Sequence, residues 1–135
     1  MGDAGENVEV LRRAYRAFNR GDFAASVVDF APEFEWAATG LVPGVKGIYR
    51  GPDGYRRFME SWWAEFDEPR IEVHELTGAG DHVLASLTVG GRGRKSGVEA
   101  NWDLWHVWTV EHGRVIGHQV HTNRDEALLA AGLSA

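Results

Sequence analysis

Cysteine is absent from this 135-residue chain. Its absence excludes disulfide bridges, thiolate nucleophiles and thiolate metal ligands. Basic side chains are also in deficit, since 14 Lys and Arg stand against 20 Asp and Glu and give a net charge of −6. Nucleic acid and anionic membrane surfaces attract proteins through a basic field, so neither is an expected partner.

Long apolar runs are missing as well. No stretch approaches the roughly 18 apolar residues of a membrane span, and residues 1–6 lack the basic and apolar regions of a signal peptide. We therefore expect a cytoplasmic protein. The length fits one domain with a modest core, and no internal repeat or low-complexity segment divides the chain.

Helical spacing of apolar side chains marks three segments in the first half of the chain. The first is Asn7–Arg20, which Gly21 ends. Asp22 can cap a shorter second helix that stops near Pro32. Pro52 suits the first position of a third helix, whose apolar face comprises Tyr55, Phe58, Met59, Trp62 and Phe66.

Alternating or β-branched residues then predict strands at Glu33–Ala38, Arg70–Leu76 and His82–Val89, and a short C-terminal helix follows residue 123. The glycine-rich segment Thr39–Gly51 reads as a loop, but it is too apolar for a freely solvated linker. Either its side chains fold back on the core, or it forms a lid over a cavity.

The stretch Asn101–Thr122 predicts a β-hairpin that turns at Glu111-His112-Gly113. A three-residue turn places His106 opposite His118. A two-residue turn at His112-Gly113 would instead flip the second strand. We prefer the longer turn because it gathers the apolar side chains on one face with both imidazoles: Trp102, Leu104, His106, Trp108, Val110, Ile116, His118 and Val120.

Runs of helices followed by runs of strands indicate an α+β fold, with helices over one face of a curved, mainly antiparallel sheet. Several segments carry a resemblance: Phe18–Asp22, Tyr49–Gly54, His106–Val110 with Gly113-Arg114, and Arg124–Leu128 leading to Ala131–Leu133. Through them the chain resembles the SnoaL-like branch of the nuclear-transport-factor-two-like superfamily. The resemblance implies one cystatin-like, cone-shaped domain over residues 1–135, with a mixed sheet whose concave face is covered by the three N-terminal-half helices around an apolar pocket.

The two imidazoles of the hairpin are the candidate catalytic groups. Histidine titrates near neutrality, so His106 and His118 facing each other in an apolar cavity could act as acid and base. The alternative is that each ring bonds to a backbone carbonyl or to water and fills space. The side chains expected to bind the substrate are Tyr15, Trp36, Tyr49, Trp62, Trp102, Leu104, Trp108 and Val120.

The catalytic residues of the enzymes that the chain resembles are matched only in part. The acid that binds the oxyanion in ketosteroid isomerases corresponds to His106, while their catalytic base falls at Ala38 and their helix-one tyrosine falls at Ala14, beside Tyr15. The proton-moving aspartate of the SnoaL-like cyclases falls at Val120. The sequence therefore keeps a donor and lacks the usual acids.

Two functions stay open. One is an isomerase, cyclase or lyase that performs histidine acid–base chemistry on a small, apolar, polyketide- or steroid-like carbonyl compound without a cofactor. The other is a noncatalytic module that binds an apolar ligand, with a structural dimerisation domain as the fallback. A metal site would need a third ligand beside His106 and His118, and that face of the hairpin offers none.

The opposite face of the hairpin carries Asp103 and His121, for which an edge or interface role is expected. Trp105, Val107 and Val115 on that face form a patch that a monomer would expose. We therefore expect a homodimer through the outer face of the sheet.

Overall fold

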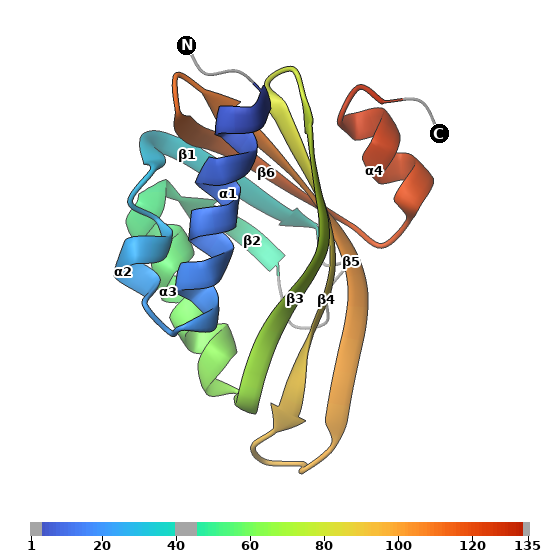
Figure 1. Ribbon diagram of the computed structural model, residues 1–135. Helices are drawn as coiled ribbons and strands as arrows, with labels where there is room; N and C mark the ends of the chain where they lie inside the picture. The colour runs from blue at the N-terminus through green and yellow to red at the C-terminus, as the bar shows by residue number, and fades with distance from the viewer. Residues whose placement is uncertain (1–3, 40–45, 134–135) are drawn as a thin grey trace.

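The computed structural model describes residues 4–39 and 46–133. The elements run in the order shown in Figure 1: α1 (Ala4–Asn19), α2 (Phe23–Ser26), β1 (Phe30–Thr39), β2 (Lys46–Arg50), α3 (Gly51–Ala64), β3 (Phe66–Ala79), β4 (His82–Gly93), β5 (Glu99–Glu111), β6 (Arg114–His121) and α4 (Arg124–Ala130).

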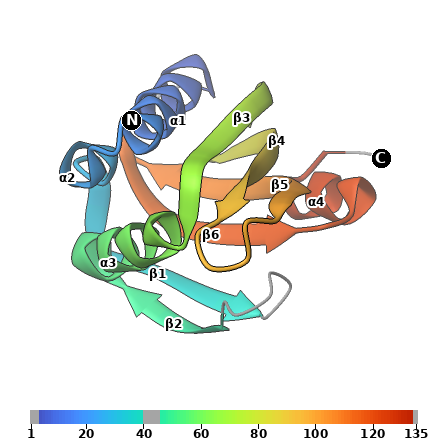
Figure 2. The ribbon, with the colours of Figure 1, turned by 90° about the horizontal axis from the view of Figure 1, so that it is seen from below.

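The strands form one curved sheet in the order β2-β1-β6-β5-β4-β3. β1 is parallel to β6, and the other neighbours are antiparallel, so the sheet is mixed. Figures 1 and 2 show α1, α2 and α3 on one side of the sheet and α4 on the other. The predicted α+β class and the helix-covered sheet are confirmed.

α1 is held against β3 at both of its ends. At its start, the backbone of Gly78 approaches Ala4 so closely that an added Cβ would meet the Ala4 carbonyl oxygen at 2.7 Å. At its end, the Asn19 amide donates to the Ile71 carbonyl at 2.7 Å and accepts from the Ile71 N–H at 2.8 Å. The buried face of α1, which includes Leu11, Tyr15 and Phe18, is thereby pressed onto the sheet.

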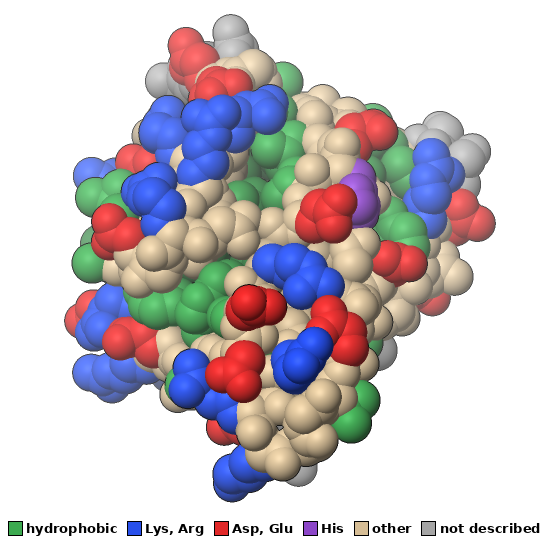
Figure 3. Space-filling model, turned by 60° about the horizontal axis from the view of Figure 1, so that its bottom comes forward, with side chains coloured by type: hydrophobic (Ala, Val, Ile, Leu, Met, Phe, Trp, Pro, Cys, Tyr) green, Lys and Arg blue, Asp and Glu red, His purple; other side chains and the backbone are tan. Residues whose placement is uncertain are grey.

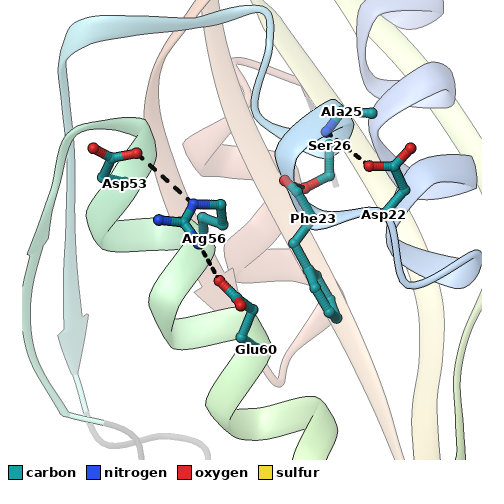
Figure 4. A network of polar contacts seen from close by, with 7 residues as sticks. All are labelled: Asp22, Phe23, Ala25, Ser26, Asp53, Arg56 and Glu60. Atoms are coloured by element: carbon teal, nitrogen blue, oxygen red, sulfur yellow. Dashed lines mark hydrogen bonds and ion pairs between the residues drawn. The ribbon is translucent and has the colours of Figure 1, made fainter.

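Local polar contacts fix the shorter helices, as Figure 4 shows for α2 and α3. Asp22 caps α2 by accepting from the Ala25 N–H at 3.2 Å. On the outer side of α3, Arg56 forms ion pairs with Asp53 and Glu60 one turn away on either side. These exposed pairs orient side chains and leave the opposite, apolar face of α3 free to face the interior.

Two predicted boundaries are wrong, and one strand lies in a segment predicted as a loop. α2 ends at Ser26 rather than near Pro32, because Phe30 already belongs to β1 and pairs with β6 at Val115. Phe66 begins β3 instead of ending α3. β2 lies inside the segment expected to be a loop, where it pairs with β1 and sets Tyr49 opposite Trp36. The choice between a lid and side chains folded back on the core for Thr39–Gly51 depends on residues 40–45, which lie outside the described residues.

The hairpin of β5 and β6 departs from the expected register. Its turn has two residues, since Glu111 pairs with Arg114, and both His112 and Gly113 have positive φ. A shift between the Thr109–Gly117 and Val110–Val115 pairs then inserts Ile116 as an extra residue. This bulge undoes the expected flip, so His106 and His118 still share a face. His106 pairs with Val120, however, and His118 pairs with Trp108.

The expected patch on the outer face is not exposed. Val107 is 1 % exposed and packs with Leu128 and Ala131 of the α4 region, against which Trp105 also packs. Val115 is fully buried in the other core cluster, on the inner side of the sheet. The argument for a homodimer from these three side chains is therefore wrong, because sequence spacing did not reveal that α4 folds back over the sheet.

Candidate functional site

A small apolar cavity of about 60 Å³ lies between the concave face of the sheet and helices α1 and α3. Its wall contains side chains from α1, β1, α3, β3, β4, β5 and β6. Trp62 and Trp102 are partly buried members of that wall. Figure 3 shows one face of the molecule on which hydrophobic side chains reach the surface among charged ones.

Most of the expected site residues meet in this wall. They are Tyr15, Trp36, Trp62, Trp102, Leu104, His106, His118 and Val120. Two others lie behind it. Tyr49 stacks on Trp36 at a ring separation of 5.2 Å, and Trp108 has no exposed surface and supports His118 from behind. Neither of these two side chains lines the cavity.

Sequence reasoning missed part of the wall, namely Phe18, Tyr55, Phe58, Met59, Ile71 and Val89. Tyr55, Phe58 and Met59 belong to the apolar face of α3, which was expected over the concave face of the sheet, but only Trp62 of this face was assigned to the site. The apolar spacing of the third helix was thus the available signal. What the spacing could not supply was which other side chains of that face border the cavity.

A chain of buried hydrogen bonds determines which nitrogen of His106 carries its proton. The Trp108 indole N–H donates to the Tyr15 hydroxyl oxygen at 2.7 Å, and that oxygen lies 2.8 Å from Nδ1 of His106. The Tyr15 proton has no other acceptor among the described residues, so it is donated to Nδ1. His106 therefore carries its own proton on Nε2.

His118 has no such partner. Its ring stacks on Trp108 at 3.8 Å with an interplanar angle of 21° and meets His106 edge to face at 4.7 Å. Both of its nitrogens are buried and have no hydrogen-bond partner among the described residues. Leaving a buried polar atom unpaired costs about 1–3 kcal/mol. Each such atom calls for an explanation, and a ligand in the cavity that His118 lines is one.

Burial also sets the charge of the site. It lowers the pKa of His106 to about 3, with a smaller contribution from His121. The pKa of His118 is lowered well below its usual value by burial, and then by His106 and His121. Burial raises the pKa of Tyr15 and of Tyr55. All four groups are uncharged at neutral pH, and the described residues of the wall include no carboxylate and no basic side chain.

The two positions at which related enzymes carry a catalytic carboxylate also leave the site uncharged. Val120 lies in the cavity wall, and Ala38 packs at the edge of the core, so neither supplies a carboxylate. On the outer face, Asp103 accepts a hydrogen bond from Thr88, and His121 lies beside Gln119. Within residues 4–39 and 46–133, no three potential metal-ligating side chains come together.

The sequence profile described as "SnoaL-like domain" matches residues 11–118. The chain belongs to this family. The SnoaL-like domain family includes polyketide cyclases and isomerases, and its NTF2-like fold is a ligand-binding fold that is often dimeric. The predicted membership is thus confirmed. None of the curated proteins matches this SnoaL-like domain at a significant level.

Solved structures are similar over nearly the whole chain. An NTF2-like protein of unknown function from Burkholderia pseudomallei K96243 is 25% identical, with a TM-score of 0.76, over 92% of this chain and 95% of that one. A protein with a ketosteroid isomerase-like fold from Catenulispora acidiphila, in complex with trimethylamine, is 14% identical with a TM-score of 0.74, over 93% of each chain. TerC, co-crystallised with polyporic acid, is 20% identical with a TM-score of 0.74, over 94% and 98%. The last two likenesses concern the fold alone.

Proposed function

We propose that this SnoaL-like domain is an isomerase- or cyclase-type enzyme that moves a proton on a small, apolar, uncharged carbonyl compound. The observation that carries the proposal is the pair of imidazoles in the cavity wall. His106 lines the cavity and carries its proton on Nε2, and His118 beside it has two buried nitrogens without a partner among the described residues. A donor and a free base next to each other are the two groups that enolisation needs.

The roles follow from the hydrogen bonds. The substrate carbonyl oxygen accepts from Nε2–H of His106, while an unprotonated nitrogen of His118 takes a proton from the carbon beside the carbonyl. The C–H electron pair moves into the carbon skeleton and onto the oxygen. His118 then returns the proton to another carbon, so atoms and charge balance without a cofactor.

The surroundings select the kind of substrate. Proton transfer creates an imidazolium and an enolate side by side, and the pair is neutral as a whole. A substrate that is already charged would stay unpaired in a wall without carboxylates or basic chains. His118 is a weak base because its pKa is lowered. The C–H bond must therefore be acidic, as it is between a carbonyl group and a C=C bond.

The test uses 3-cyclopentenone, whose C2–H bond lies between these two groups. Its isomerisation to 2-cyclopentenone moves a proton from C2 to C4 and is followed by the absorbance of the conjugated product. We expect the native protein to accelerate the reaction and His118→Asn to lower the rate about 10²–10⁴-fold, the usual contribution of a positioned base. Because the pKa of His118 is lowered, the rate should persist down to about pH 5, where an ordinary histidine is protonated.

His112→Asn is the matched control. His112 lies in the exposed turn of the hairpin at positive φ, which asparagine tolerates, and it is far from the cavity wall. Its rate should equal that of the native protein. Equal rates for His118→Asn and the native protein would refute the proposed role of His118.

A noncatalytic binding module is the second candidate, favoured by the absence of a carboxylate among the described residues of the wall, where Val120 stands at one of the expected acid positions. On this reading, the same pocket holds its ligand without turning it over. Copurified ligand in native mass spectrometry, together with no isomerisation by the native protein, would favour this function over the enzyme.

We also propose that the protein works as a cytoplasmic homodimer, joined through the part of the outer sheet face that α4 leaves open. The often dimeric fold supports the pairing. Within the described residues, no helix is long and apolar enough to span a bilayer.

A further inference from the structure

The two imidazoles of the cavity differ in the hydrogen bonds that they can form with a ligand. Only Nε2 of His106 is left for a ligand, because Nδ1 already accepts a hydrogen bond from the Tyr15 hydroxyl. Its remaining nitrogen is a donor. His118 keeps both nitrogens, one a donor and one an acceptor in the neutral ring, and neither bonds to a described residue.

The rings are close enough for one compact group to reach both. Their centroids are 4.7 Å apart and their planes are perpendicular. The His118 ring lies flat against Trp108, which limits how far it can turn away. A ligand that only accepts hydrogen bonds would satisfy His106 and leave the bare nitrogen of His118 buried and unpaired.

The volume and the charge of the site narrow the choice further. A cavity of about 60 Å³ is less than half of the roughly 150 Å³ that accommodates benzene in a dry protein core. Only a compact polar head fits at the imidazoles, and any larger part must extend past the partly exposed Trp62 and Trp102. The apolar wall offers no counter-charge for an ion.

We propose that the cavity recognises a compact neutral group with a carbonyl oxygen and an N–H or O–H side by side, as in a cyclic amide or the enol form of a 1,2-diketone. The oxygen accepts from His106, and the neighbouring hydrogen is donated to His118. This inference rests on the proposed function for the roles of the two imidazoles. It adds the requirement for a donor on the ligand, which proton transfer from carbon does not need.

A matched series of five-membered rings tests the requirement. 2-Pyrrolidinone has the carbonyl and the N–H, cyclopentanone has the carbonyl alone, cyclopentane has neither, and pyrrolidine is a cation at neutral pH. Dissociation constants come from titrations that follow the imidazole and indole resonances of the native protein by NMR. We expect the lactam to bind about tenfold more tightly than the ketone, the factor that one hydrogen bond typically supplies. Pyrrolidine should not bind.

Three results would overturn the inference: equal affinity for lactam and ketone, binding of the pyrrolidinium ion, or no binding of the lactam up to its solubility limit. His118→Phe keeps a flat ring over Trp108 and removes the acceptor, so the ratio of lactam to ketone affinity should fall to about one. If this variant does not fold, the ratio in the native protein still decides.

The outcomes separate the two proposals. Lactam selectivity without isomerisation of 3-cyclopentenone would refute the enzyme and keep the recognition rule. Isomerisation without lactam selectivity would keep the enzyme and refute the rule.

Discussion

At the scale of single residues, one hydroxyl group controls the chemistry of the pocket. The Tyr15 oxygen accepts from Trp108 and donates to His106, and all three groups are buried. Tyr15 therefore acts as a positioning residue whose effect on a ligand passes through the His106 ring. The sequence expectation that Tyr15 itself binds the substrate remains untested, although its ring does line the cavity.

Replacing Tyr15 with Phe should destabilise the protein by about 2–4 kcal/mol, because it leaves the Trp108 N–H and the His106 Nδ1 buried without partners. Urea unfolding measures the loss. Imidazole ¹⁵N shifts should also show His106 no longer held in the form protonated at Nε2.

Tyr55→Phe is the matched control for this change. Tyr55 is also buried in the cavity wall, and its hydroxyl forms no hydrogen bond to any described residue. Its loss should change the free energy of unfolding by less than about 1 kcal/mol and leave the His106 shifts in place. Equal effects of the two substitutions would contradict the hydrogen-bond chain.

At the scale of elements, the position of α1 decides where Tyr15 lies. The helix is attached to β3 by Asn19, one turn beyond Tyr15. Both hydrogen bonds join the Asn19 side chain to the backbone of a single residue, Ile71, so they fix the helix end in both directions along the strand. Ile71 itself lines the cavity.

Asn19→Ala should cost about 1–3 kcal/mol of stability, because it leaves the Ile71 N–H and carbonyl without these partners. Amide hydrogen exchange at Ile71 should become faster than in the native protein. Gln119→Ala, an exposed change on β6, serves as the control and should leave that exchange unaltered. Unchanged exchange in Asn19→Ala would show that the attachment does not depend on this side chain.

Periodicity in the sequence was sufficient for some elements and not for others. The face of α1 and the inner face of β5 repeat every 3.6 and 2 residues, so both could be predicted from spacing. β2 has five residues, and its Ile48 is 56 % exposed, so no repeat marked it. The Ile116 bulge and the bond between Tyr15 and His106 depend on pairing between distant segments, which local spacing does not encode.

At the scale of the whole molecule, α4 divides the outer face of the sheet. It covers Leu84 and Val107, whereas Thr88 and Asp103 and, farther along the sheet, Gln119 stay accessible to solvent in part. The accessible area is polar and linked across strands, since His74 and Asp103 both bond to Thr88. A second copy joined there would bury a polar surface rather than the apolar patch expected from the sequence.

We predict that light scattering will find twice the monomer mass and that Gln119→Arg will shift the protein toward monomer. A two-fold axis brings the same patch of each subunit together, so the added charges repel each other. Ser61→Arg adds the same charge on the exposed side of α3 and should leave the mass unchanged. A native protein of monomer mass would rule out the dimer.

The parallel pairing of β1 with β6 also constrains how the protein is made. β1, which begins at Phe30, pairs with β6, which ends at His121, so this pairing forms only after nearly the whole chain has been made. Tyr15 likewise bonds to His106, a residue that is made much later. During synthesis, the parts of helices α1–α3 that pack on β5 and β6 therefore stay uncovered until the last hairpin emerges. Such long-range closure slows folding and exposes the nascent chain to aggregation. A chaperone that shields these helices should raise the yield of folded protein more than one that acts after release.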